Sequence, residues 1–183
     1  MTKVVVSMFL SADGVMEEPA WTFPYWNDEI AKFKSAEMAK TGALLLGRVT
    51  WEGFAEAWPG REDEEGYADK MNSMPKYVVS TTLQNPEWTN SHVISGDVVA
   101  EIKKLKAQDG EDLLVFGSAT LVNFLIQHDL VDEYNLLVYP VVLGTGKRLF
   151  QDGSATALEL AETYEVGRGV VAFRYRRAAG EAN

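Results

Sequence analysis

Two glycines stand where an apolar run gives way to a helical pattern, and each could bring backbone N–H groups against a phosphate. The first junction is Gly47-Arg48-Val49-Thr50, directly after the apolar run 43–46. Glycine lets a ligand approach the backbone, and the first turn of a helix offers unpaired N–H groups and the positive end of its dipole. Thr50 adds a hydroxyl donor, and Arg48 adds a planar guanidinium that suits a phosphate. Taken alone, the same residues also fit a tight turn with an exposed arginine.

The second junction is Gly117-Ser118, which follows the apolar run 113–116 and precedes another helical pattern. A pyrophosphate would fit there, although single strand–glycine–helix turns are common in α/β proteins. Two such junctions in one chain favour a dinucleotide ligand. Neither fits the G-x-G-x-x-G fingerprint of Rossmann dehydrogenases, and the sequence contains no G-x-x-x-x-G-K-[ST] motif of P-loop NTPases.

Two further segments could contact a substrate. The loop 140–150 contains Gly144 and the adjacent cations Lys147 and Arg148, which could meet an anionic group in a chain whose net charge is −10. Asp13 lies in Ser11-Ala12-Asp13-Gly14, directly after the first apolar run. Both segments also fit plain connections between strands. The residue types alone single out no catalytic acid or base.

Composition excludes several classes of chemistry. The chain has no cysteine and only two histidines, His92 and His128, so we expect no disulfide, no thiol catalysis and no metal site. The charge of −10 argues against binding to nucleic acid, because phosphates would meet a repelling field. No apolar run approaches the roughly 20 residues that span a bilayer, and the first residues lack a secretory signal pattern. We therefore expect a cytoplasmic protein that contacts no membrane.

A length of 183 residues suits one domain, which we place at residues 1–177 with a short tail at 178–183. Apolar runs predict strands at 4–10, 43–46, 76–80, 92–94 and 113–116. Helical patterns at 27–40, 48–56, 97–106 and after Ser118 alternate with these strands, and we expect Gly42 to end the first helix. In that helix, Ile30 and Phe33 should face inward. This alternation predicts a parallel sheet with helices on both faces, and 59–75 as a solvated loop with some helix.

The C-terminal third has a different pattern. A long apolar strand is predicted at 134–143, followed by strands at 158–164 and 170–176 that are joined by the turn Gly167-Arg168-Gly169. Strands joined by so short a turn must be antiparallel. The predicted fold is therefore α/β, with a mixed but mainly parallel sheet of about eight strands that ends in an antiparallel hairpin. The strand 134–143 and the hairpin after Leu158 carry more apolar residues than helices can cover, which predicts a homodimer.

Taken in order, these segments resemble the dihydrofolate-reductase-like superfamily. The closer resemblance is to the C-terminal reductase domain of the riboflavin-biosynthesis deaminase-reductase and to its stand-alone relatives. It covers residues 3 to 176 and is carried by Ser11-Ala12-Asp13-Gly14, Leu46-Gly47-Arg48-Val49-Thr50-Trp51-Glu52, Lys76-Tyr77-Val78-Val79-Ser80-Thr81, Val115-Phe116-Gly117-Ser118 and the loop 140–150. No single segment is specific, but the ordered set is.

The resemblance implies that NADPH is the hydride donor. By the same resemblance, the phosphates of NADPH would be held by Gly47, Arg48, Thr50, Gly117 and Ser118, with Ser80 and Thr81 near the adenosine end. On the substrate side we place Asp13, Gly144, Lys147 and Arg148. Asp28 and Glu29 lie near the position of the folate-binding acid, but their neighbours do not reproduce that pattern.

The sequence therefore predicts an NADPH-dependent reductase related to the 5-amino-6-(5-phosphoribosylamino)uracil reductase of riboflavin biosynthesis. Its substrate would be a small heterocycle, with or without a phosphate. Two alternatives stay open at this point. One is a dihydrofolate or pterin reductase, and the other is a nucleotide-binding domain of the same fold without turnover.

Overall fold

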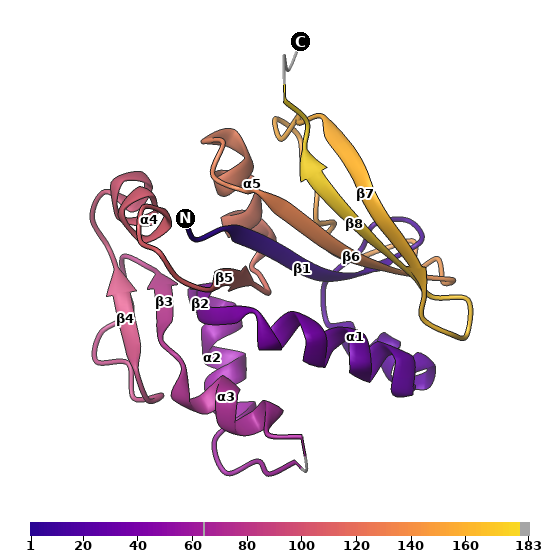
Figure 1. The fold of residues 1–183 in the computed structure, drawn as a ribbon, viewed down its shortest axis with the longest axis horizontal. Coiled ribbons are helices and arrows are strands. Elements are labelled where there is room, and N and C mark those ends of the chain that lie inside the picture. Colours follow the sequence, from indigo (N-terminus) through magenta and orange to yellow (C-terminus); the bar gives the residue numbers. More distant parts are fainter. Residues whose placement is uncertain (64, 180–183) are drawn as a thin grey trace.

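The fold is an eight-stranded sheet with helices on both faces (Figure 1). The structure is a computed structural model that describes residues 1–63 and 65–179, so residues 180–183 of the predicted tail lie outside the described residues. The strands are β1 Val4–Ser11, β2 Thr41–Gly47, β3 Lys76–Val79, β4 Ser91–Ile94, β5 Asp112–Val115, β6 Glu133–Tyr139, β7 Leu158–Glu165 and β8 Val171–Arg177. The helices are the 3-10 helix η1 Pro19–Tyr25, α1 Asp28–Ala39, α2 Arg48–Ala57, α3 Tyr67–Ser73, α4 Val98–Lys106 and α5 Ala119–Gln127.

The strand order is β4-β3-β2-β5-β1-β6-β8-β7. The first six of these strands run parallel to one another, whereas β8 pairs antiparallel with both β6 and β7. The predicted parallel body with an antiparallel C-terminal hairpin is thus confirmed. Strand β5 lies between β2 and β1, so the sheet order changes direction there, and open α/β sheets bind ligands at such points.

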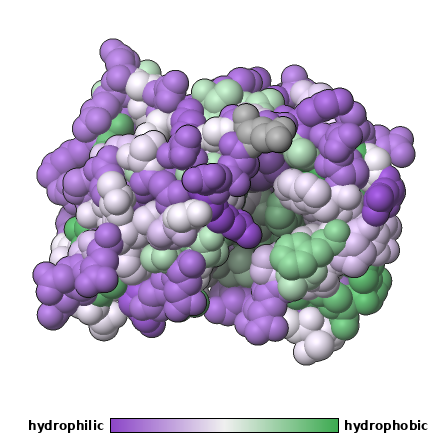
Figure 2. All heavy atoms as spheres, turned by 90° about the horizontal axis from the view of Figure 1, so that it is seen from below, coloured by the Kyte–Doolittle hydropathy of each residue, from purple (hydrophilic) through white to green (hydrophobic). Residues whose placement is uncertain are grey.

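Alternation along β1 divides the core between two faces. Val4 and Val6 pack in one buried cluster with α4 and α5, and Val5 packs in another with α1, α2 and α3. Successive side chains of a strand point to opposite faces, which is why an unbroken apolar run gives a strand buried on both sides. Figure 2 views the molecule from the side of α1 and α3 and shows a hollow near the centre, with hydrophobic residues in its depth.

Two predicted boundaries are wrong for physical reasons. Gly42 does not end the first helix, because α1 ends at Ala39 and Gly42 lies within β2. A Cβ on Gly42 would come within 2.9 Å of the Glu111 Cβ, so glycine is needed there for close approach. The long strand predicted at 134–143 ends at Tyr139, because Pro140 has no N–H to continue the ladder.

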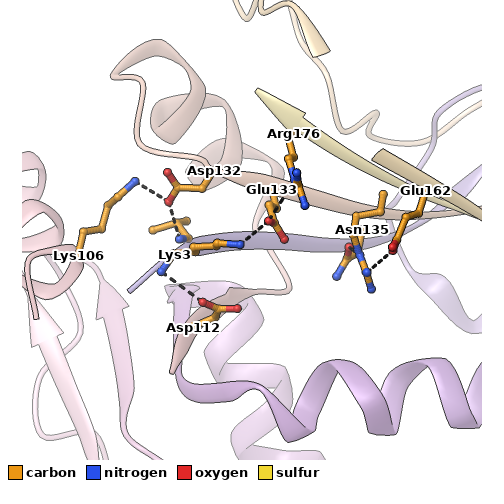
Figure 3. Close-up of polar contacts among 10 residues, drawn as sticks. Lys3, Lys106, Asp112, Asp132, Glu133, Asn135, Glu162 and Arg176 are labelled. Carbon is orange, nitrogen blue, oxygen red and sulfur yellow. Dashed lines mark hydrogen bonds and ion pairs between the residues drawn. The ribbon is translucent and has the colours of Figure 1, made fainter. Parts of the chain in front are cut away.

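The amino ends of the central strands are held by charged side chains (Figure 3). The ammonium of Lys3 forms an ion pair with Glu133 at 2.6 Å, and its backbone N–H donates to Asp112 at 3.3 Å. Asp132 accepts from the ammonium of Lys106, also at 2.6 Å. These contacts join β1, β5, β6 and α4 at the amino ends of the strands, whereas the glycine turns lie at the carboxyl ends. None of the described helices has the length and apolar character that a membrane span requires.

Candidate functional site

The two glycine turns predicted from the sequence contact each other. They follow the neighbouring strands β2 and β5, and the Gly47 N–H donates to the Gly117 carbonyl at 3.0 Å. A Cβ on Gly47 would lie 2.7 Å from the Ser118 Oγ, and a Cβ on Gly117 would lie 2.9 Å from the Thr50 Oγ1. Gly117 also has φ +134°, a region that favours glycine. The fold thus brings Gly47, Thr50, Gly117 and Ser118 together, and only glycine fits at two of these positions.

The two helices that begin at these turns differ in how their first N–H groups are used. Ser118 caps α5, because its Oγ accepts from the Leu121 N–H at 3.2 Å. Gly47 is the N-cap of α2 and offers no side-chain cap. The first turn of α2 therefore keeps the free N–H groups and dipole end that suit a phosphate. A dinucleotide phosphate fits the donors present at this turn.

Arg48 and the Ser80-Thr81 pair flank this turn. The Arg48 Nη1 donates to both carboxylate oxygens of Glu52, at 2.7 and 2.9 Å, and its side chain is 43% exposed. Gly47 pairs with Val79 in the sheet, so Ser80, the residue after β3, lies beside Gly47 at the carboxyl ends of these strands. The Ser80 Oγ accepts from the Leu83 N–H at 3.0 Å, and Thr81 is exposed. The sheet thus lines up the residues that were assigned to the cofactor.

Asp13 is held by three hydrogen bonds. Its carboxylate accepts from the Ser11 Oγ at 2.6 Å and from the N–H groups of Leu143 and Gly144 at 3.1 and 2.9 Å. The hydrogen bond from Ser11, followed by those from Leu143 and Gly144, lowers the pKa of Asp13 to about 2. Asp13 therefore fixes the start of the glycine-rich loop while it is ionised.

The two predicted cations of that loop are used differently. The Arg148 Nε donates to the Asp13 carbonyl at 2.9 Å, and its Nη2 lies 3.6 Å from the Asp13 carboxylate. Lys147 is exposed and joins the same segment through its backbone, whose N–H donates to Glu17 at 2.9 Å. Asp13, Gly144 and Arg148 thus form one unit, which we call the Asp13 unit. The side chain of Lys147 points to solvent.

The Asp13 unit and the glycine turns meet at Met16. The Met16 N–H donates to the Lys147 carbonyl at 2.9 Å, and its Cε lies 3.7 Å from the Cβ position of Gly117. The residues assigned to the cofactor and to the substrate therefore border one region at the carboxyl ends of β1, β2 and β5. Asp28 and Glu29 are exposed at the start of α1, where Asn27 caps the helix, so neither is aimed into this region.

A buried polar cluster on the α1 side of the sheet was not predicted. The ammonium of Lys34 donates to the Ser7 Oγ at 2.6 Å and pairs with Glu37, which also accepts from Ser7 and from the Asn135 amide. We call Ser7, Lys34, Glu37 and Asn135 the Lys34 cluster. The side chains of Lys34 and Glu37 are only 7% and 4% exposed.

The Lys34 cluster continues across the C-terminal strands. Ser7, Asn135, Arg174 and Glu162 are paired in register on β1, β6, β8 and β7. Arg174 donates to the Asn135 Oδ1 at 3.2 Å and pairs with Glu162. At its inner end, the Lys34 ammonium lies 4.6 Å from the ring centre of Phe116, the residue before Gly117. The one sequence signal was that Lys34 and Glu37 follow Ile30 on the inward face of the helix.

Comparison with known proteins agrees with this geometry. Residues 2–172 match the family described as the RibD C-terminal domain. The chain belongs to this family. The uncharacterized protein YyaP of Bacillus subtilis (strain 168) is 35% identical over 136 residues, which are 72% of this chain and 72% of that protein.

Solved structures show the fold of this RibD C-terminal domain. A proposed riboflavin biosynthesis protein from Shewanella sp. PV-4 has a TM-score of 0.74 at 21% identity, covering 97% of this chain and 100% of that one. Dihydrofolate reductase from Enterococcus faecalis, solved with NADP(H) and RAB-propyl, has a TM-score of 0.65 at 16% identity, covering 97% of each chain. The dihydrofolate-reductase-like fold expected from the sequence resemblance is confirmed.

Proposed function

We propose that the protein is an NADPH-dependent reductase that transfers a hydride to a small heterocyclic substrate in the cytoplasm. The observation that carries this proposal is the contact between the two glycine turns, beside an α2 N-terminus without a side-chain cap. Such a pair of turns suits a dinucleotide pyrophosphate. Membership of the RibD C-terminal domain family supports a reaction like that of the 5-amino-6-(5-phosphoribosylamino)uracil reductase of riboflavin biosynthesis.

Each residue near the turns receives a role in this proposal. Gly47, Thr50, Gly117 and Ser118 hold the phosphates, and Arg48 with Ser80 and Thr81 contacts the adenosine end. NADPH supplies the hydride once bound. The chain positions the two reactants and keeps water away from them.

The substrate side is the Asp13 unit. Asp13 holds the backbone at Leu143 and Gly144, and the cations of Lys147 and Arg148 lie at the rim, where a substrate phosphate would meet them. Met16 separates this unit from Gly117, so a substrate placed here would border the cofactor.

Two measurements on the purified full-length protein test the proposal. Calorimetric titration should give tighter binding of NADPH than of NADH. NADPH oxidation, followed by absorbance, should be faster with 5-amino-6-(5-phosphoribosylamino)uracil than with 7,8-dihydrofolate. Turnover of dihydrofolate alone would assign the chain to folate reduction. Binding of NADPH without oxidation by either compound would indicate a nucleotide-binding domain.

A further inference from the structure

The hydroxyl of Tyr139 is buried without a hydrogen-bond partner among the described residues. Tyr139 is the last residue of β6, its side chain is fully buried, and none of the described protein groups reaches its Oη. A buried hydroxyl that lacks a partner costs free energy that phenylalanine at the same position would avoid. Burial raises the pKa of Tyr139, so the hydroxyl keeps its proton and can act as a donor.

The surroundings of Tyr139 are aromatic and lie beside the proposed reaction site. The rings of Phe9, Trp21 and Tyr25 meet the Tyr139 ring edge-on, with centres 5.4 to 5.6 Å away. Lys34 lies between this group and the cofactor turn, because its ammonium is 5.5 Å from the ring centre of Phe9 and 4.6 Å from that of Phe116. Phe9 and Lys34 thus connect Tyr139 to Phe116, the residue before Gly117.

The segment that covers Tyr139 packs its aromatic side chains on the core but is held by few hydrogen bonds. Trp21 and Tyr25 belong to η1, in which Thr22 is the one buried residue and Phe23 is 73% exposed. Trp21 bonds locally, from its Nε1 to the Glu17 carbonyl at 3.1 Å. Within the described residues, two side-chain hydrogen bonds reach η1 from the segments that follow it: Asn27 donates to the Tyr25 carbonyl at 3.0 Å, and Arg168, in the turn between β7 and β8, donates to the Pro24 carbonyl at 2.6 Å. Moving Trp21 aside would therefore break little structure.

We propose that the Tyr139 hydroxyl is the hydrogen-bond anchor for the substrate ring, which takes the place of Trp21 against Phe9 and Tyr139. The ring is a planar heterocycle with an exocyclic carbonyl, such as an oxo-pyrimidine. Its carbonyl oxygen accepts from Tyr139, and its faces and edges pack on the aromatic side chains. This inference rests on the proposed function, since it names the substrate class of the same site.

The first test needs no ligand. Tyr139→Phe removes one oxygen from an otherwise unchanged ring, so the free protein should unfold at a higher urea concentration than the wild type. Tyr134→Phe is the matched control, because Tyr134 is equally buried but lies on the opposite face of β6. If Tyr139→Phe has a lower urea midpoint than both the wild type and Tyr134→Phe, the hydroxyl is already paired and the inference fails.

The second test uses 5-amino-6-(5-phosphoribosylamino)uracil as the probe, titrated by calorimetry into protein saturated with NADP⁺. Wild type and Tyr134→Phe should bind it equally, and Tyr139→Phe should bind it about tenfold more weakly, which corresponds to one lost hydrogen bond. Equal binding to Tyr139→Phe would overturn the anchor. Absence of probe binding in a wild type that still binds NADPH would overturn the substrate class. Failure to bind NADPH at all would instead refute the proposed function.

Discussion

Arg48 should decide which nicotinamide cofactor the protein prefers. Its guanidinium is partly exposed at the first turn of α2 and pairs with Glu52, so it can turn toward a ligand phosphate. Only NADPH carries a 2′-phosphate, and a charge-assisted hydrogen bond contributes about 1.5–3 kcal/mol. We expect NADPH to bind roughly ten- to hundred-fold more tightly than NADH.

Replacing Arg48 with Ala should remove most of that preference and leave NADH binding unchanged. Arg61→Ala is the control, because Arg61 stacks over Trp58 at 5.0 Å beyond the end of α2. Calorimetric titration of both variants with both cofactors decides the matter. Equal affinities of the wild type for NADPH and NADH would contradict this role.

The ionised state of Asp13 should stabilise the fold in a pH-dependent way. Its pKa is lowered from the ordinary 3.8 to about 2 in the folded protein. Between these values the unfolded chain binds a proton that the folded protein does not, so the contribution is complete above pH 3.8 and is lost as the pH falls toward 2. Asp13→Asn should therefore unfold at lower urea than the wild type at pH 7, and the gap should narrow as the pH falls below about 4.

Urea midpoints at several pH values test this expectation, with Asp152→Asn as an exposed control. A gap between Asp13→Asn and the wild type that stays constant down to about pH 3 would show that the carboxylate charge is not what holds Leu143 and Gly144.

The sequence was a good guide to backbone turns. The turns at Gly47 and Gly117 were predicted because a glycine between an apolar run and a helical pattern is typical of a tight strand-to-helix turn. The Lys34 cluster was missed because its members come from β1, α1 and β6, and local patterns cannot show that these meet. Tyr139 was missed for a related reason, since its unpaired hydroxyl is a property of its described neighbours.

At the scale of elements, the contact between the start of α2 and the β5 turn should limit what Gly117 tolerates. A Cβ there would press on the Thr50 Oγ1 at 2.9 Å, and φ +134° disfavours any side chain. We expect Gly117→Ala to move the two turns apart and to weaken NADPH binding about tenfold or more while the circular dichroism spectrum stays native. Gly53→Ala, which lies on α2 with open space around it, should keep the wild-type affinity. Native NADPH affinity in Gly117→Ala would show that the phosphates of NADPH do not bind at this turn.

The loop 144–150 should matter for the substrate and not for the cofactor. It is tied to Asp13 and Val15 after β1, whereas the glycine turns follow β2 and β5. Replacing Lys147 and Arg148 together with Ala should raise the KM for a phosphorylated substrate about tenfold, with NADPH affinity unchanged. The adjacent pair Lys103 and Lys104 on α4 gives the matched double variant. Loss of NADPH binding would assign the loop to the cofactor.

The elements themselves were mostly predictable, because buried parallel strands have unbroken apolar runs and helices have a different period. Their boundaries were less so. Gly42 looked like a helix end, but its role depends on Glu111, which is distant in sequence. The insertion of β5 between β2 and β1 is a long-range pairing, and no local pattern in the sequence predicted it.

At the scale of the whole molecule, the C-terminal strands carry an apolar surface that we expect to pair two copies. Phe173 and Tyr175 stack on β8 with ring centres 5.8 Å apart, and Leu160, opposite Tyr175 on β7, is 52% exposed. In Figure 1, β7 and β8 extend beyond α4 and α5, the helices on this side of the sheet. Light scattering at micromolar concentration should give twice the 20.3 kDa mass of one chain.

The charge of β7 indicates how the two copies would meet. This edge strand carries Glu159, Glu162 and Glu165, so pairing two copies edge to edge would bring like charges together. Charged side chains on edge strands commonly prevent such association. Packing through the face of Leu160, Phe173 and Tyr175 avoids that repulsion and buries apolar area. Leu160→Asp with Phe173→Asp should therefore give a monomer. Phe23→Asp, which changes an aromatic residue that is 73% exposed on η1, should remain a dimer. A monomeric wild type would refute this expectation. A double variant that is still a dimer would show that the interface lies on another surface.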